Sequence, residues 1–218
     1  MVLGIAGSGG FGREILETVN AINRKSNRYE EIVFIEIFDE ELEIQGVKTI
    51  TIERAKEKYR DELGMIVGIG EPKIRHRVIE QAKELGVRLV SVIHPSVEIP
   101  DTTTIGAGTY IGPGAFISCN VNIGENVAVH PSVNVGHDTV IGNNVVMCGN
   151  TSLGGNCHIA DDAFLGMNVS VKQGCKIGTG AVVGMGSAVY GDVEEYTTAI
   201  GIPARVMKKR NESDKVFS

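Results

Sequence analysis

A histidine followed directly by an aspartate, His137-Asp138, is the pair in this sequence best suited to proton transfer. Imidazole titrates close to neutral pH, so it can accept a proton from a nucleophile under physiological conditions. A carboxylate beside it can fix the ring tautomer and stabilise the imidazolium that forms. The residues alone leave a second interpretation open, in which His137 is a solvated histidine with no chemical role.

A glycine-rich loop, Gly7-Ser8-Gly9-Gly10-Phe11-Gly12, lies between an apolar run and a helical pattern. In this setting backbone N–H groups can bind phosphates, and a GxGxxG loop by itself suggests NAD. The next strand, however, ends ambiguously at Glu36-Ile37-Phe38-Asp39, and no part of the chain remains for a separate dehydrogenase domain. Both features make NAD a less favoured interpretation.

The other histidines and the cysteines form no metal-ligand pattern. The four cysteines include no CxxC pair, which indicates reduced thiols in a cytoplasmic protein rather than a zinc or disulfide framework. His94 and His130 share one position of the repeat described below, but His137 does not share it. We therefore expect no metal. His94 and His158 are expected to be structural, whereas structural and ligand-contact interpretations both remain open for His130.

Charge and hydropathy exclude several classes of partner. The chain has 218 residues, a net charge of −6 and a pI near 5.4, whereas a general nucleic-acid binder needs a basic excess. No apolar run approaches the ~20 residues that cross a bilayer. The start of the chain lacks a basic segment followed by an apolar core and a cleavage site, so we expect no signal peptide. The expected protein is cytoplasmic and binds neither nucleic acid nor membrane.

Two regions of different composition must position the candidate residues. Residues 1–90 carry 30 of the 48 charged side chains, whereas residues 91–192 carry 9. In the first region strand-like and helical patterns alternate, with strands expected at 2–6, 32–35 and 65–69 and helices expected through about residue 23 and over 71–85. This alternation predicts a small Rossmann-like parallel α/β domain over residues 1–90.

Residues 91–192 divide into 17 consecutive six-residue units (hexads) without any insertion. The third residue of every hexad is Ile, Val, Leu or Met, and the first is always Ser, Thr, Ala, Val or Cys. A period of six fits one short strand and one corner, with the third side chain pointing inward. Three such faces close an 18-residue coil, and coils stack at ~4.8 Å. The pattern predicts an all-β parallel β-helix over 91–192, of unspecified handedness, followed by a C-terminal tail over 193–218.

The hexad frame also places the candidate residues relative to one another. His137 is the fifth residue of its hexad, so it lies near a corner from which its side chain can project outward. Gly155 follows it by one 18-residue coil and therefore lies at the same corner.

The order of these features resembles the bacterial nucleotide-amino-sugar N-acetyltransferases of the PglD type and the related sialic-acid O-acetyltransferases of the NeuD type. It consists of a GxGxxG α/β domain, an uninterrupted hexad region and then Gly201-Ile202-Pro203-Ala204-Arg205, and the resemblance extends to about Lys209. It implies a left-handed β-helix and a homotrimer with acetyl-CoA in the groove between neighbouring β-helices. It also implies that the N-terminal domain holds the nucleotide part of the sugar donor.

For the transfer chemistry, the resemblance implies that His137 is the general base and Asp138 its acidic neighbour. The Gly155 N–H would donate to the carbonyl oxygen of the thioester, although a glycine is equally explained by the needs of the corner. Relatives have a second histidine where this chain has Val146. Val146 and Met167 are accordingly expected to line the acetyl-CoA groove.

For the nucleotide sugar, the resemblance implies contacts with Gly9, Gly10, Phe11 and Gly70. Either Glu36 or Asp39 would then meet the base, and the sequence does not choose between them. His130 stands where relatives often have an asparagine that contacts the sugar near the acceptor. This departure leaves the geometry of the acceptor side open.

We therefore expect an acetyl-CoA-dependent N-acetyltransferase that acts on the amino group of a UDP- or dTDP-linked 4-amino-4,6-dideoxyhexose. The alternative is O-acetylation of a sugar hydroxyl, for example on sialic acid, because one base serves either nucleophile. A rival of another class is a non-catalytic β-helix, either a scaffold or a carbonic-anhydrase-like shell. Its zinc form needs several converging histidines, which the hexad positions do not provide.

Overall fold

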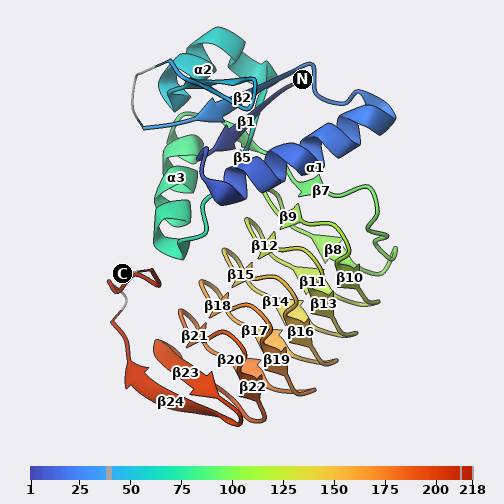
Figure 1. The fold of residues 1–218 in the computed structure, drawn as a ribbon, viewed down its shortest axis with the longest axis vertical. Helices are drawn as coiled ribbons and strands as arrows, with labels where there is room; N and C mark the ends of the chain where they lie inside the picture. The colour runs from blue at the N-terminus through green and yellow to red at the C-terminus, as the bar shows by residue number, and fades with distance from the viewer. Residues whose placement is uncertain (38–40, 212, 218) are drawn as a thin grey trace.

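The N-terminal residues form a six-stranded sheet with the order β3-β4-β2-β1-β5-β6 in the computed structural model, which describes residues 1–37, 41–211 and 213–217 (Figure 1). Its strands are β1 (Val2–Ala6), β2 (Glu31–Ile35), β3 (Glu43–Ile44), β4 (Val47–Ile50), β5 (Leu63–Val67) and β6 (Arg88–Leu89). β3 pairs antiparallel with β4, and the other pairs are parallel. Every residue of β1 and β5 is buried, as expected of central strands covered on both faces.

The helices of this domain are α1 (Gly10–Ser26), α2 (Ile52–Tyr59), the 3₁₀-helix η1 (Arg60–Glu62) and α3 (Pro72–Glu84). The structure confirms the Rossmann-like α/β class and the three strands and two helices expected from the sequence. It adds α2, β3, β4 and β6. The helical pattern of apolar residues in α2 is weak in the sequence, because only Ile52 and Ala55 of its eight residues are buried. Thr51 starts it by accepting a hydrogen bond from the Arg54 N–H.

Residues 91–192 wind into a three-sided prism below this domain (Figure 1). The first face holds β7 (Val92–Ile93), β9 (Tyr110–Ile111), β12 (Ala128–Val129), β15 (Val146–Met147), β18 (Phe164–Leu165) and β21 (Val182–Val183). The second holds β10 (Phe116–Ile117), β13 (Asn134–Val135), β16 (Ser152–Leu153), β19 (Ser170–Val171) and β22 (Ala188–Val189). The third holds β8 (Thr104–Ile105), β11 (Asn122–Ile123), β14 (Val140–Ile141), β17 (His158–Ile159) and β20 (Lys176–Ile177).

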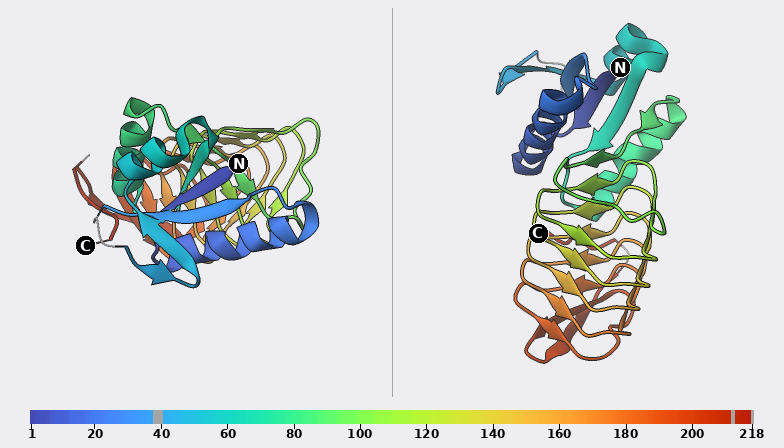
Figure 2. Two further views of the ribbon diagram at one scale, coloured as in Figure 1. Left: turned by 90° about the horizontal axis from the view of Figure 1, so that it is seen from above. Right: turned by 90° about the vertical axis from the view of Figure 1, so that its right-hand side faces the viewer.

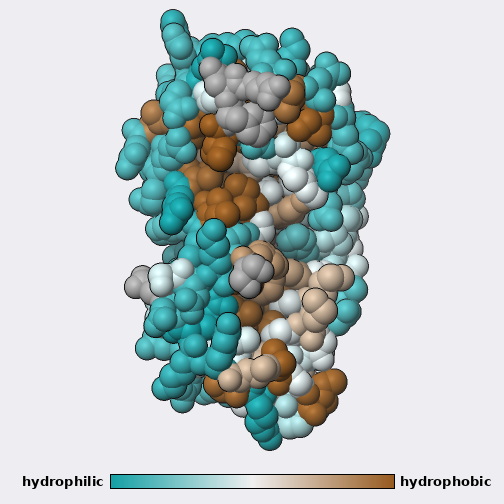
Figure 3. All heavy atoms as spheres, turned by 60° about the vertical axis from the view of Figure 1, so that its left-hand side comes forward, coloured by the Kyte–Doolittle hydropathy of each residue, from teal (hydrophilic) through white to brown (hydrophobic). Residues whose placement is uncertain are grey.

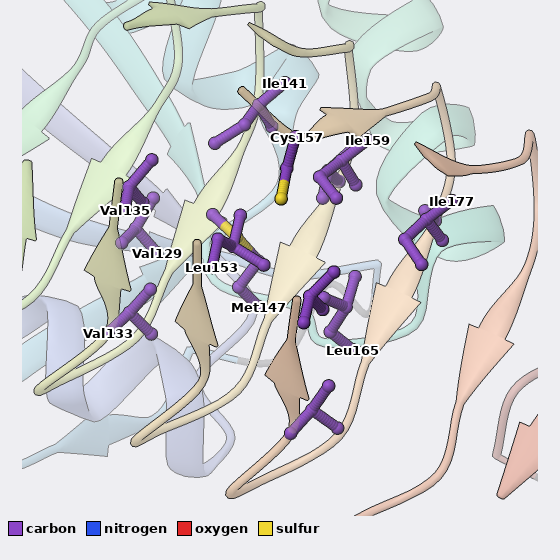
Figure 4. Packing of buried hydrophobic residues seen from close by; sticks show 14 of the residues in the cluster. Val129, Val133, Val135, Ile141, Met147, Leu153, Cys157, Ile159, Leu165 and Ile177 are labelled. Carbon is purple, nitrogen blue, oxygen red and sulfur yellow. The ribbon is translucent and has the colours of Figure 1, made fainter. Parts of the chain in front are cut away.

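The hexad pattern corresponds directly to this prism. Each strand pairs in parallel with the strand 18 residues along, as Ala128 does with Val146. The third residues fill the interior, and Val129, Val135 and Ile141 are at most 2 % exposed (Figure 4). The sixth residues from Gly108 to Gly186 have positive φ angles and are glycine, asparagine, aspartate or serine. Glycine and the short polar Asn and Asp adopt this left-handed conformation most readily, so the sixth position turns each corner.

A buried arginine ties the two domains together. Arg75 of α3 is fully buried, and it donates hydrogen bonds to the carbonyl oxygens of Val67 and Ile69 at the end of β5, both at 2.9 Å. It also donates to the backbone oxygen and to Oδ1 of Asn126 on the prism, both at 2.7 Å. Burial lowers the pKa of Arg75 to about 9. On the other side α1 lies across the top of the prism (Figure 2), where Thr18 Oγ1 is 3.2 Å from the Tyr110 hydroxyl.

The chain beyond the last hexad continues the first face. β23 (Thr197–Gly201) pairs with β21, and β24 (Ala204–Lys209) returns antiparallel to β23. The chain then runs back toward α3, where the N–H groups of Val216 and Phe217 both donate to Glu71 Oε2 at 2.9 Å. No helix in the described part of the chain is long and apolar enough to span a membrane.

Apolar side chains are exposed at the foot of the prism. Met185, Ile202 and Met207 are 78 %, 74 % and 64 % exposed. The view of this side shows hydrophobic surface near the foot and again near the α/β domain (Figure 3).

Candidate active site

His137 and Asp138 lie at the corner between the second and third faces, between β13 and β14. His137 Nδ1 is 2.7 Å from Asp138 Oδ2, and both side chains are about half exposed. Asn120, one coil earlier, donates from Nδ2 to Asp138 Oδ1 at 2.9 Å. The hydrogen bonds from His137 and Asn120 lower the pKa of Asp138, so its carboxylate stays ionised beside the imidazole. This arrangement favours a proton on Nδ1 and leaves Nε2 to act as a base.

Gly155 lies directly against the free edge of the His137 ring. A Cβ atom added at Gly155 would be 2.6 Å from both Cε1 and Nε2 of His137, so only glycine leaves room for the imidazole. The Gly155 N–H has no acceptor in the described part of the chain. A backbone donor and a basic nitrogen are therefore adjacent at one exposed corner, the combination that acyl transfer requires.

His130 lies at a different corner, between the first and second faces. Its ring stacks on Phe11 at a centroid distance of 4.4 Å and an interplanar angle of 31°, and it meets the Tyr110 ring edge-on at 6.3 Å. Its Nδ1 is 3.6 Å from Glu14 Oε2 on α1. The structure thus brings His130 together with the predicted substrate loop but not with His137. Glu14 has no distinguishing signal in the sequence, because only the packing of α1 on the prism brings it to His130.

The glycine loop has both close packing and open space. A Cβ atom at Gly12 would be 1.8 Å from the Gly7 carbonyl oxygen, so a glycine is required there. By contrast, Cβ atoms at Gly9 and Gly10 would meet nothing within 4 Å. Gly9 caps α1 without a side-chain hydrogen bond, and the first turn holds no acidic residue. The start of α1 is therefore free to bind an anionic group.

A cavity of about 150 Å³ opens at the carboxyl ends of β1 and β2, where α/β sheets bind ligands. Its lining includes Gly7, Glu36, Ile52, Ile69 and Gln81. Glu36 Oε1 accepts a hydrogen bond from the Ser8 N–H at 2.7 Å, so this carboxylate holds the glycine loop and also borders the cavity. Asp39, the other candidate for the base, lies outside the described residues.

The other predicted contacts lie away from the His137 corner. Val146 is 1 % exposed because Phe11 and Val216 cover the outer side of the first face around it. Its surface is therefore closed to a ligand in this structure. Met167 is 50 % exposed and is the fifth residue of its hexad at the corner of His130 rather than of His137. Gly70 lies near the ring of Phe217, since a Cβ atom added at Gly70 would be 3.7 Å from Cε2 of Phe217.

In residues 1–37, 41–211 and 213–217, no group of three or more His, Cys, Asp or Glu side chains is placed to hold a metal ion. The cysteines Cys119, Cys148, Cys157 and Cys175 are all free thiols.

Models of known protein families match both the α/β domain and the hexad region. The PglD N-terminal domain matches residues 2–82. The hexapeptide repeat of succinyl-transferase matches residues 117–148, and the bacterial transferase hexapeptide (six repeats) matches residues 156–191. No curated protein matches the chain.

Solved structures match it over nearly its full length. The acetyltransferase domain of PglB from Neisseria gonorrhoeae is 25 % identical, with a TM-score of 0.87 over 94 % of this chain and 99 % of that one. PerB from Caulobacter crescentus, in complex with CoA and GDP-perosamine, is 26 % identical, with a TM-score of 0.86 over 95 % and 98 %. WeeI from Acinetobacter baumannii is 27 % identical, with a TM-score of 0.88 over 95 % and 100 %.

The prism is thus the left-handed parallel β-helix of hexapeptide-repeat proteins, and the chain is an acetyltransferase of this class. Its N-terminal region matches the PglD N-terminal domain, which precedes the repeats. The resemblance inferred from the glycine loop and the hexads is confirmed.

Proposed function

We propose that this protein transfers an acetyl group from acetyl-CoA to the amino group of a nucleotide-linked amino-deoxysugar. The observation that carries the proposal is the His137–Asp138 pair, held with Nδ1 toward the carboxylate and its free edge against Gly155. PerB, which shares the fold over nearly its whole length, has been solved with CoA and GDP-perosamine.

In the proposed reaction the sugar amine attacks the carbonyl carbon of the thioester. His137 Nε2 takes a proton from the amine nitrogen as the carbon–nitrogen bond forms, and Asp138 stabilises the resulting imidazolium. The Gly155 N–H donates to the oxyanion of the tetrahedral intermediate. The intermediate collapses by breaking the carbon–sulfur bond, and the His137 imidazolium returns its proton to the departing thiolate, which releases CoA as the thiol together with the acetylated sugar.

The α/β domain supplies the proposed nucleotide-sugar site. The uncapped start of α1 at Gly9 and Gly10 suits a diphosphate, and the cavity beside Glu36 suits a base. The expected nucleotide was UDP or dTDP, and the GDP-perosamine bound by PerB adds GDP to the panel that must be tested.

We also propose that the active enzyme is a homotrimer in the cytoplasm. His137 and the glycine loop face different corners of the prism, so a complete site requires a neighbouring copy to supply one of the two. The apolar side chains exposed at the foot give copies a surface to share. Sedimentation equilibrium should give three chains per particle, and a monomer that turns over substrate at the normal rate would contradict this assembly.

Replacing His137 tests the mechanism. His137→Ala should lower kcat by about 10³-fold, within the range of general-base catalysis, while the fold and assembly stay intact because the side chain is exposed. The matched control is His158→Ala, another exposed histidine on the third face. Thiol release with acetyl-CoA and GDP-, UDP- and dTDP-linked amino sugars measures the rate. Near-normal turnover by His137→Ala would refute the assignment.

O-acetylation remains the second candidate because the same base can deprotonate a hydroxyl. The same assay with free sialic acid separates the two. Turnover of sialic acid, and of none of the nucleotide amino sugars, would replace the proposed function by sugar O-acetylation.

A further inference from the structure

His130 has an acidic partner of its own, on a helix of the other domain. Glu14 Oε2 lies 3.6 Å from His130 Nδ1, a looser contact than the 2.7 Å between Asp138 Oδ2 and His137 Nδ1, but on the same ring nitrogen. His130 lowers the pKa of Glu14 against the opposing effect of burial, so Glu14 is a carboxylate. The molecule therefore carries two histidine–carboxylate pairs that both leave Nε2 free.

The His130 ring is firmly held. Its side chain is 16 % exposed, because Phe11 stacks on one face and Tyr110 packs edge-on. The polar contact of the His130 ring within the described part of the chain is made through Nδ1, and Nε2 has no hydrogen-bond partner there. The ring thus presents one unsatisfied nitrogen beside the loop that we propose binds the nucleotide sugar.

The neighbouring thiol does not use this pair as a base. Cys148 follows His130 by one coil in the same hexad position, but burial and the charge of Glu14 raise the pKa of Cys148 to about 11. It stays protonated and is a poor nucleophile. Of the groups around the ring, Glu14, Tyr110 and Cys148, only Glu14 is charged near neutral pH.

We propose that Glu14 is a positioning residue for the acceptor sugar: it holds His130 through Nδ1 so that Nε2 accepts a hydrogen bond from an amino or hydroxyl group of that sugar. This inference rests on the proposed function. A carboxylate beside Nδ1 favours the tautomer that carries the proton there, which makes Nε2 the acceptor. The sugar amine or hydroxyl supplies the N–H or O–H donor. His130 thereby contacts the substrate, and Glu14 acts through it.

A double-mutant cycle of Glu14→Gln and His130→Ala tests this role. Each single variant should raise the KM for the nucleotide amino sugar about tenfold, the effect of one lost hydrogen bond, with kcat and the KM for acetyl-CoA within about twofold. The double variant should be no worse than His130→Ala alone. Inhibition of Glu14→Gln by the free nucleoside diphosphate should match wild type, because that ligand lacks the amino sugar that His130 would contact.

Glu17→Gln, one turn along α1 and also exposed, is the matched control. The proposal is overturned if Glu14→Gln and Glu17→Gln have the same KM for the nucleotide amino sugar, or if the effects of Glu14→Gln and His130→Ala on that KM add in the double variant. It is also overturned if Glu14→Gln raises the inhibition constant of the nucleoside diphosphate as much as it raises the KM for the nucleotide amino sugar. A wild-type enzyme that accepts no nucleotide amino sugar would instead defeat the proposed function itself. Equal melting temperatures for all variants exclude a general loss of structure.

Discussion

The two histidine–carboxylate pairs are built in opposite ways. His137 and Asp138 are adjacent residues, and the repeat fixes their geometry: the fifth residue projects from the corner and the sixth turns it at φ +59°. His130 and Glu14 belong to different domains and meet only because α1 lies on the prism. The first pair is a product of local backbone structure, whereas the second is a product of domain packing.

This difference separates chemistry from recognition within the proposed enzyme. A locally encoded pair keeps its geometry when distant parts of the molecule move, which suits a proton acceptor that needs accurate placement. A pair that spans two domains forms only when the glycine loop and the prism are correctly placed relative to each other, which suits substrate recognition. Changes near each pair should therefore affect different kinetic constants.

After the loss of His137 itself, the largest effect is expected from Gly155→Ala. Its Cβ would overlap Cε1 and Nε2 of His137 at 2.6 Å, so the ring must move away from the donor N–H. We expect kcat to fall about 100-fold, because small displacements of reacting groups are costly, with no change in the KM for the nucleotide sugar. Steady-state kinetics with both substrates varied measures this.

Gly191→Ala provides the control, since a Cβ there meets nothing within 4 Å and should leave kcat unchanged. If Gly155→Ala keeps full activity, the ring tolerates displacement, and the locally fixed geometry is not required.

A smaller effect is expected from Asp138→Asn. Asparagine occupies the same corner position one coil before and one coil after, at positive φ, so the backbone should not change. The loss of the negative charge should lower kcat about tenfold, because the imidazolium is less stabilised while the exposed site is partly compensated by water. The KM for the nucleotide sugar should stay constant. If Asp138→Asn changed the KM for the nucleotide sugar but not kcat, Asp138 would act in substrate binding, and the two pairs would not differ in role.

The smallest catalytic effect is expected from Arg75→Met, which weakens the joint between the domains. The substitution leaves the carbonyl groups of Val67, Ile69 and Asn126 without their donor, at a cost of about 2–4 kcal/mol in the free energy of unfolding. We expect the KM for the nucleotide sugar to rise about threefold, with kcat unchanged, because only the His130–Glu14 pair depends on the joint. Denaturant unfolding and kinetics measure the two effects.

If Arg75→Met also lowered kcat about threefold, the His137–Asp138 pair would depend on domain packing as well. A melting temperature equal to that of wild type would show that the buried arginine does not hold the joint.

The repeat made most of the fold predictable. The third residues of the hexads are apolar because they fill the prism, and the sixth residues are small or polar because they turn its corners. That frame also predicted that His137 is exposed and that Gly155 lies beside it. Such features depend on interactions within one coil or between adjacent coils, so a period of six residues is enough to reveal them.

Tertiary structure decided how the two domains meet. Neither the charge of Glu14 nor its place on α1 distinguishes it from Glu17, and the burial of Arg75 has no signal in a helix rich in charged residues. Likewise, nothing in the hexads shows that Phe11 and Val216 cover Val146. The sequence by itself determined the repeating backbone and the side chains that the backbone orients. Contacts between segments far apart in the chain depend on how whole surfaces fit, and only the folded molecule specifies that fit.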